Sequence, residues 1–115
     1  MKASVTLKKN HEFQRMYKKG ASEVGPYMVV YCRKNKLDHN RLGITASVKL
    51  GKAVARNRAR RRLREIYRLH LDQIQTGWDI VLVARARSIR GDYHAMTQSF
   101  LRQCKKLGIL KENMS

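Results

Sequence analysis

The sequence has 115 residues, of which 26 are Lys or Arg and 8 are Asp or Glu, so its formal net charge is +18 at pH 7. Hydrophobic residues make up 43% of the chain, as in an ordinary globular protein, which excludes a disordered basic tail. A chain of this length folds as one domain, residues 1–115, and its charge favours a polyanionic partner.

The cysteines and the N-terminus indicate a cytoplasmic protein. Cys32 and Cys104 have no CxxC or Cys/His spacing, so we predict two small buried residues in a reducing compartment, without a disulfide framework or a zinc site. The N-terminus lacks the apolar run of a signal peptide, and no stretch approaches the roughly 20 apolar residues of a membrane helix. We therefore expect no membrane partner.

The first predicted element is a helix that lies between Asn10, as its N-cap, and Gly20, which ends it. Phe13, Met16 and Tyr17 share one face of this helix. We expect Met16 in the core. Phe13 and Tyr17 either join it there or form an exposed platform on which nucleotide bases stack.

Two strands are predicted next, at residues 27–32 and 41–48, joined by a turn at residues 35–40. Alternation in the first strand places Tyr27, Val29 and Tyr31 on one face of a sheet and Met28, Val30 and Cys32 on the other. Gly43 in the second strand indicates that another part of the chain comes close to its backbone. We expect the two strands to pair as an antiparallel hairpin.

Residues 49–68 hold the highest density of charge, with nine basic side chains and a single acid, Glu65. At about 100° per residue, one stripe of this segment carries Ala55, Ala59, Leu63, Ile66, Tyr67 and His70. The opposite side, which we call the basic face, carries Asn57, Arg60, Arg61, Arg64 and Arg68. Because a disordered tail has no reason to separate these two sets, the pattern predicts a packed helix.

The basic face is suited to nucleic acid. Arginine pairs bidentately with phosphate and stacks on bases, whereas a face that only keeps a protein soluble usually mixes lysine with glutamate. Gly51 would allow a tight turn before the helix, and Asn57 could give a directional hydrogen bond to a base edge or a sugar hydroxyl. We expect Glu65 to pair with neighbouring arginines.

The last part of the chain predicts a strand at residues 78–84, whose nearly continuous apolar run is typical of burial on both faces. A basic loop follows at residues 85–91, and Asp92 then caps a helix that Gly108 ends. The core stripe of this helix is Tyr93, Met96, Phe100, Cys104 and Leu107. From Ile109 onward we expect fraying. The elements α β β α β α predict an α+β sandwich with one mixed sheet.

No catalytic group is evident in the sequence. His11, His39, His70 and His94 have no metal-binding spacing, and the eight acids form no pair suited to acid–base chemistry. We predict a protein that binds RNA without metal ligands or catalytic residues of its own.

The chain resembles the protein subunit of bacterial ribonuclease P along residues 41–65, which read RLGITASVKLGKAVARNRARRRLRE. The hallmark of that family is an arginine-asparagine-arginine helix preceded by a strand, a glycine turn and a lysine. Here the matching positions are Arg56, Asn57 and Arg58, preceded by Arg41, Gly43, Ser47, Lys49 and Gly51. The resemblance continues from LKKNHEFQRMYKKG near the start, through VVY, to WDIVLVAR, and so covers most of the chain.

The resemblance implies a two-layer αβββαβα sandwich similar to a ribosomal-protein domain, with a left-handed βαβ crossover that presents the basic helix. This order contains one strand more than the pattern predicts, which we expect near residues 22–27. It also implies that the RNA subunit and its bound Mg²⁺ ions perform catalysis, while the protein acts on the 5′ leader of precursor tRNA.

By position, the resemblance implies contacts of two kinds. The RNA subunit is expected to bind Lys49, Lys52, Arg56, Asn57, Arg58, Arg60, Arg61, Arg64 and Arg68. The leader is expected to bind a cleft at Phe13, Tyr17, Val29 and Tyr31. The expected partners are ribonuclease P RNA and precursor tRNA, and the free protein is expected to be a monomer.

Two alternatives use the same basic helix. A ribosomal or general structural RNA-binding protein would not need exposed aromatic rings. A DNA-binding module would place the helix in a major groove, but neither a helix-turn-helix spacing nor a dimerisation signal is present.

Overall fold

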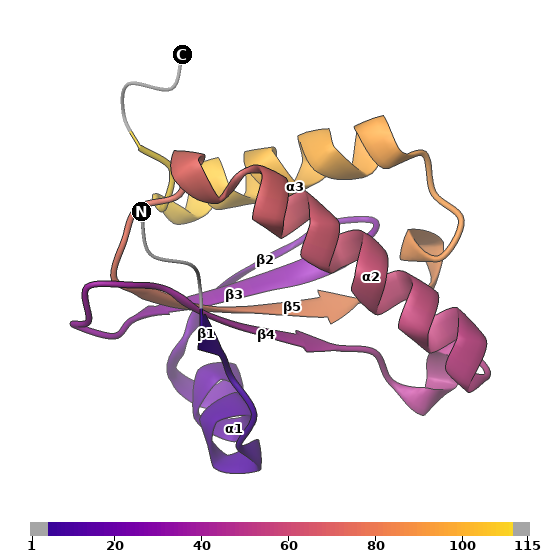
Figure 1. The fold of residues 1–115 in the computed structure, drawn as a ribbon, viewed down its shortest axis with the longest axis horizontal. Coiled ribbons are helices and arrows are strands. Elements are labelled where there is room, and N and C mark those ends of the chain that lie inside the picture. Colours follow the sequence, from indigo (N-terminus) through magenta and orange to yellow (C-terminus); the bar gives the residue numbers. More distant parts are fainter. Residues whose placement is uncertain (1–4, 112–115) are drawn as a thin grey trace.

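The computed structural model describes residues 5–111. The strands are β1 (Val5–Thr6), β2 (Ala21–Val24), β3 (Met28–Lys34), β4 (Arg41–Thr45) and β5 (Trp78–Ala84). The helices are α1 (Asn10–Lys19), α2 (Ala53–Leu69) and α3 (Tyr93–Leu107), with short 3-10 turns η1 (Val48–Leu50), η2 (Leu71–Gln73) and η3 (Ala86–Ser88) (Figure 1). The α+β class and the extra strand before β3 are confirmed, whereas the sequence analysis missed β1, whose two residues are too few to form a pattern.

The strands form one mixed sheet in the order β1-β4-β5-β3-β2. β4 runs parallel to β1 and β5, whereas β3 runs antiparallel to β5 and β2. The predicted hairpin of β3 with β4 is therefore wrong, because β5 lies between them. β5 needs this central place since its side chains are apolar on both faces. As parallel neighbours joined through α2, β4 and β5 form the βαβ crossover that the family resemblance implies.

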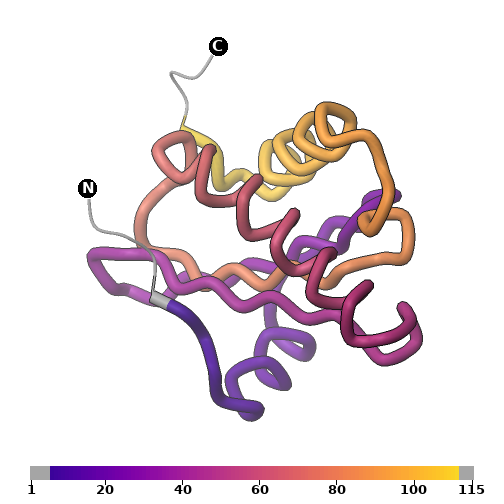
Figure 2. Tube along the Cα trace, turned by 45° about the vertical axis from the view of Figure 1, so that its right-hand side comes forward, coloured from indigo at the N-terminus to yellow at the C-terminus, as the bar shows by residue number. Residues whose placement is uncertain are grey.

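Two hydrophobic clusters lie on opposite faces of the sheet, with α2 and α3 on one face and α1 on the other (Figures 1 and 2). The larger cluster, under α2 and α3, contains Met28, Val30 and Cys32 of β3, and Ile80 and Leu82 of β5. The smaller cluster, under α1, contains Leu7, Met16 and Val81, with Phe13, Tyr31 and Val83 packed against it. The predicted alternation is confirmed for residues 28–32, but Tyr27 lies before β3 and packs against the larger cluster, so its predicted face is wrong. α1 leaves part of its face of the sheet open.

Some of the predicted helix caps are present in the structure, and one is not. Asp92 accepts a hydrogen bond from the backbone N–H of Ala95, and Gly108 ends α3 with a φ of 76°, as predicted. Asn10 is instead the first residue of α1, and Lys9 stands before it without a side-chain cap, so the predicted N-cap is wrong.

Backbone hydrogen bonds hold the residues that follow α3 against the segment before β5. Ile109 is fully buried, and its carbonyl oxygen accepts a hydrogen bond of 2.8 Å from the backbone N–H of Gln75. The N–H of Lys111 donates to the carbonyl of Gln73 at 2.9 Å. The predicted fraying is therefore wrong for these residues, and the rest of the prediction, for residues 112–115, lies outside the described part of the chain.

Both cysteines are free and buried, as predicted for two small core residues. Burial raises the pKa of Cys32 to about 11 and that of Cys104 to about 12, so neither is a reactive thiolate near neutral pH. In α3, Met96 and Phe100 are buried beside Cys104 as predicted, but Tyr93 is 36% exposed and lies outside the core.

Candidate nucleic-acid interface

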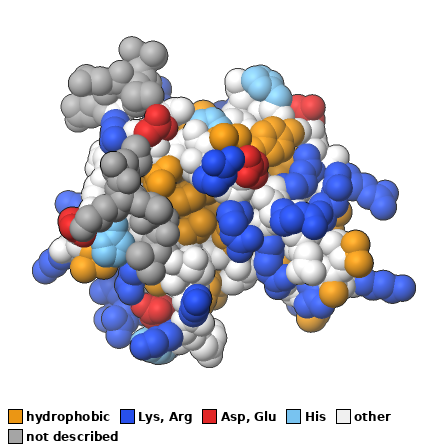
Figure 3. Space-filling model, viewed as in Figure 1, with side chains coloured by type: hydrophobic (Ala, Val, Ile, Leu, Met, Phe, Trp, Pro, Cys, Tyr) orange, Lys and Arg blue, Asp and Glu red, His pale blue; other side chains and the backbone are white. Residues whose placement is uncertain are grey.

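Helix α2 separates its apolar and basic side chains as the sequence pattern predicts. Ala59, Leu63, Ile66 and Tyr67 are buried against the sheet and α3. Gly51 precedes the helix with a φ of 130°, a conformation that side chains other than glycine rarely adopt. Figure 3 shows that Lys and Arg side chains gather on the right-hand half of the molecule, where α2 begins. The buried stripe thus holds the basic face toward solvent.

Most of the basic face is exposed. Asn57, Arg61, Arg64 and Arg68 are exposed, whereas Arg60 is half-buried. Glu65 accepts two hydrogen bonds from Arg68, at 2.7 and 3.2 Å. This pairing lowers the pKa of Glu65 and raises that of Arg68. Arg61 and Arg64 have no carboxylate partner within residues 5–111, so they are the members of the face best placed to bind phosphate.

Arg60 points to a different surface from the rest of the basic face. Its Nη1 donates to Oδ1 of Asn57 at 2.9 Å, and its Nη2 lies 3.5 Å from the carbonyl oxygen of Ala46. β1 pairs only with Arg41 and Leu42, so the end of β4 has no neighbouring strand on this side among the described residues. Arg60 can therefore reach across the edge of the sheet toward the face that α1 occupies.

Two arginines of α2 are bound to the loop between β5 and α3. Nε of Arg58 donates to the carbonyl of Ile89 at 2.7 Å. Arg62 donates to the carbonyls of Ser88 and Gly91, at 2.9 and 2.5 Å. Arg62, which is not among the expected RNA contacts, therefore holds the loop. Arg58 serves the same purpose with Nε and keeps its other nitrogens free of hydrogen bonds to described residues.

The other expected contacts surround the start of α2. Lys49 and Lys52 are exposed. Arg56 is half-buried, and its Nε is buried without a hydrogen-bond partner in the described part of the chain. The structure thus brings the expected RNA-subunit residues onto α2 and the turn before it, but only some of them face solvent freely.

An open groove of about 720 Å³ lies beside α1 on its face of the sheet. This aromatic groove is lined by Leu7, Lys8, Phe13, Tyr17, Tyr31, Ile44, Thr45, Ala46, Ser47, Arg60 and Val83. The rings of Tyr17 and Tyr31 meet edge to face, with centroids 5.1 Å apart and planes at 63°. Of the two rings that the sequence left open, Tyr17 is 38% exposed and available to a ligand, whereas Phe13 is half-buried and packs against the smaller hydrophobic cluster.

Gly43 sets the position of the Phe13 ring in this groove. A β-carbon at residue 43 would lie 2.6 Å from the ring of Phe13 and 3.3 Å from the β-carbon of Leu7. Only glycine leaves room for the ring at this distance, so the close approach predicted for Gly43 is confirmed.

Val29 differs from the other three expected leader contacts, because it does not line the aromatic groove. It is half-buried and pairs with Val24 of β2 on one side and Val83 of β5 on the other. The sequence analysis did not name Val83, and it assigned Arg60 to the RNA subunit and not to this groove. Val83 could have been found only from the register of β5 with β3, and Arg60 only from the exposed edge of β4.

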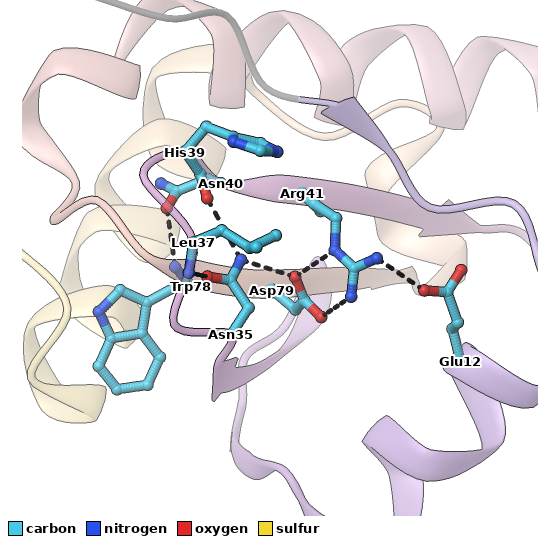
Figure 4. A network of polar contacts seen from close by, with 8 residues as sticks. All are labelled: Glu12, Asn35, Leu37, His39, Asn40, Arg41, Trp78 and Asp79. Atoms are coloured by element: carbon cyan, nitrogen blue, oxygen red, sulfur yellow. Dashed lines mark hydrogen bonds and ion pairs between the residues drawn. The ribbon is translucent and has the colours of Figure 1, made fainter.

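An ion-pair network holds α1 against the sheet (Figure 4). Arg41 of β4 donates to both carboxylate oxygens of Asp79 on β5, at 2.8 and 2.6 Å, and to Glu12 of α1 at 2.8 Å. Asn35 donates a further hydrogen bond of 2.9 Å to Asp79. Hydrogen bonding to Asp79 is the main cause that raises the pKa of Arg41. The network fixes the helix that carries Phe13 and Tyr17.

Replacing Asp79 by asparagine is expected to lower the free energy of unfolding. The variant removes the charge that balances Arg41, and we expect a loss of about 2 kcal/mol, below the range for fully buried pairs. The side chains of Asp79, Glu12 and Arg41 are 15%, 20% and 30% exposed, and water screens the pair accordingly. Urea denaturation measures the loss.

The control for this prediction is Asp72→Asn, which makes the same change of charge at an exposed site. It is expected to change the free energy of unfolding by less than about 0.5 kcal/mol. Equal stabilities of the Asp79→Asn and Asp72→Asn proteins would contradict the role given to the network.

Residues 5–111 contain neither a candidate metal site nor a helix that could span a membrane. No group of three or more His, Cys, Asp or Glu side chains in this range is placed to hold a metal ion. No helix in the same range is both long and apolar enough to cross a membrane.

The chain is similar to known proteins in both sequence and fold. A family model described as Ribonuclease P matches residues 1–108. The chain is 40% identical over 114 residues to the ribonuclease P protein component of Natranaerobius thermophilus, and this match covers 99% of each chain. The match to that of Clostridioides difficile is 42% identical and covers 90% of this chain and 91% of the relative.

Solved structures agree with the sequence matches. The ribonuclease P protein of Staphylococcus aureus superposes with a TM-score of 0.82 at 37% identity, over 95% of this chain and all of the other. That of Thermotoga maritima superposes with a TM-score of 0.79 at 35% identity, over 88% of this chain and 96% of the other.

Proposed function

The chain belongs to the ribonuclease P protein family, whose members are accessory subunits of an RNA-based endoribonuclease, and we propose that it binds RNA through two surfaces that meet at Arg60. The exposed part of the basic face binds the RNA subunit. The aromatic groove binds the 5′ leader of precursor tRNA. The observation that carries this proposal is the open groove lined by three aromatic rings, of which Tyr17 is exposed and Phe13 and Tyr31 are half-buried. A protein that only packs against structural RNA does not need such a groove.

The aromatic groove suits a single strand of varied sequence. Every base has a π-face, so stacking on Tyr17, Tyr31 and Phe13 does not depend on which base is present. Lys8 and Arg60 stand at the same groove and can neutralise leader phosphates. Arg60, which the sequence grouped with the RNA-subunit contacts, is therefore proposed to bind the leader.

The basic face suits the folded RNA subunit. Arg61 and Arg64 present free guanidinium groups, each able to pair bidentately with phosphate. The side-chain oxygen of Asn57 accepts a hydrogen bond from Arg60, which leaves the side-chain N–H groups of Asn57 for a base or a sugar hydroxyl. Lys49 and Lys52 extend the positive potential toward the turn before α2.

Mg²⁺ enters this proposal through the RNA subunit, which binds the ions that support catalysis. The protein carries a net charge of +18 and lies between two polyanions, so it lowers the repulsion between them. It therefore reduces the concentration of Mg²⁺ needed for processing. The same charge keeps the free protein monomeric, because copies of it repel one another.

The direct experiment mixes the pure protein with a bacterial ribonuclease P RNA and a precursor tRNA at low Mg²⁺. The expected result is release of the 5′ leader at a Mg²⁺ concentration at which the RNA alone is inactive. A gel that separates precursor from product measures it. Absence of processing by an RNA that is active alone at high Mg²⁺ would contradict the proposed function.

A further inference from the structure

A second groove, of about 600 Å³, lies between the start of α2 and the loop after β5. The aromatic groove lies elsewhere, beside α1. The second groove is lined by Lys52, Val54, Ala55, Arg58, Ile89 and Arg90. Its lining contains three aliphatic side chains, three cations and no acid. Lys52 and Arg58 are already among the expected RNA contacts, but no contact described above explains the aliphatic side chains beside them.

One aliphatic side chain of the second groove, Val54, is unusually exposed, whereas Ala55 and Ile89 are half-buried. Val54 is 81% exposed, and nearby Val48, in η1, is 74% exposed. These are the highest exposures of any large hydrophobic side chain within residues 5–111. Lone surface valines are common, but here one of them borders a groove ringed by positive charge. Such a site fits a ligand that is both flat and apolar on one part and anionic on another.

The walls of the second groove are held in place before any ligand binds. Arg58 donates to the carbonyl of Ile89 at 2.7 Å, which joins one wall to the other and fixes the plane of its guanidinium group. Arg62 holds the same loop by donating hydrogen bonds to the carbonyl oxygens of Ser88 and Gly91. Preorganised walls reduce the entropy lost when a ligand is bound.

We propose that the second groove receives one unstacked nucleotide of the ribonuclease P RNA, with its base on Val54 and Ile89 and against the guanidinium plane of Arg58. Lys52 and Arg90 then bind the phosphates on either side. Unpaired bases that leave the stack are commonly held on apolar side chains or on arginine planes in this manner. The inference rests on the proposed function, since it names a contact of the same RNA subunit.

Charge decides between this occupant and a protein. An apolar segment of a protein partner would cover Val54, but it would leave Lys52, Arg58 and Arg90 without counter-charges unless it were strongly acidic. A second copy of this chain is disfavoured, because each copy carries a net charge of +18. RNA supplies the base and the phosphates together.

The test replaces Val54 by serine and measures the affinity of the protein for ribonuclease P RNA over a range of salt concentrations. Val54 is nearly fully exposed, so the fold does not depend on it. The expected loss is about 3- to 10-fold, with an unchanged slope of log K against log salt, because no phosphate contact is removed. Arg90→Ala, in contrast, should reduce that slope by about one.

The matched control is Val24→Ser, on the edge strand β2, where a valine is 67% exposed outside this groove. It should bind as the unchanged protein does. Dimethyl sulfate probing of the complex should further reveal a base that the unchanged protein protects and the Val54→Ser protein does not.

Three results would overturn the inference: equal affinity of the Val54→Ser and unchanged proteins, an equal loss in the Val24→Ser protein, or no change in base protection. Arg61→Ala combined with Arg64→Ala separates this failure from a failure of the proposed function. If that variant binds RNA weakly while Val54→Ser binds normally, only the second groove loses its assignment. If neither substitution matters, the proposed function fails as well.

Discussion

A protein that carries Tyr17→Leu together with Tyr31→Leu is expected to bind precursor tRNA about 10- to 100-fold more weakly in the holoenzyme, because stacking contributes about 1–3 kcal/mol per base. Binding of mature tRNA, which has no leader, should remain unchanged. Leucine keeps a branched apolar side chain at both positions but removes the aromatic rings, whose centroids lie 5.1 Å apart in the aromatic groove, together with their hydroxyl groups.

This prediction is measured by the dissociation constants of the reconstituted holoenzyme for the two tRNAs. Thermal unfolding of the variant should first establish that the small core under α1, against which Tyr31 packs, is intact. Tyr93→Leu is the matched control, since Tyr93 is 36% exposed on α3 and does not line the aromatic groove. Equal losses for precursor and mature tRNA would refute the assignment of this groove to the leader.

Arg61→Ala combined with Arg64→Ala is expected to weaken binding to the ribonuclease P RNA and to flatten its dependence on salt. Each phosphate contact contributes about 0.7–0.9 to the slope of log K against log salt, so two lost contacts should reduce it by about 1.5. At about 0.1 M salt we expect a loss of affinity of about 10- to 100-fold. The stability of the fold should not change, because both side chains are exposed and free of carboxylates among the described residues.

The control removes the same two charges elsewhere. Lys105 and Lys106 are exposed in the last turn of α3, so Lys105→Ala with Lys106→Ala lowers the net charge equally without touching α2. If both double variants lose the same affinity, the binding reflects overall charge, and the basic face has no special role. A filter-binding titration at four or five salt concentrations is sufficient.

Helix α2 illustrates what could be read without a structure. Its apolar stripe and its basic face follow from a period of 3.6 residues, and Ala59, Leu63, Ile66 and Tyr67 are indeed buried. Capping by Asp92 and the end of α3 at Gly108 were equally predictable, because each depends on a few adjacent residues. The bounds of β5 were predicted for the same reason.

The pairing of the strands was the main failure. Residues 35–40 look like a hairpin turn, but Asn40 uses its side-chain oxygen to accept hydrogen bonds from the backbone N–H groups of Gly77 and Trp78, at 2.8 and 2.9 Å. This contact joins positions nearly 40 residues apart and admits β5 beside β4. No local pattern contains that information.

The sequence by itself determined the three helices, the strands β3 to β5, most of their buried faces and the segregation of arginines on α2, since these depend on neighbours along the chain. Only the tertiary structure decided that β5 separates β3 from β4, that Arg58 and Arg62 hold a distant loop, and that Val29 lies outside the aromatic groove. It also brought Arg60 across the free edge of β4 to the rings of α1 and β3. The physical reason is that the direction of a side chain follows from its position on its own helix or strand. The groups that it contacts depend instead on packing between segments that lie far apart in the sequence.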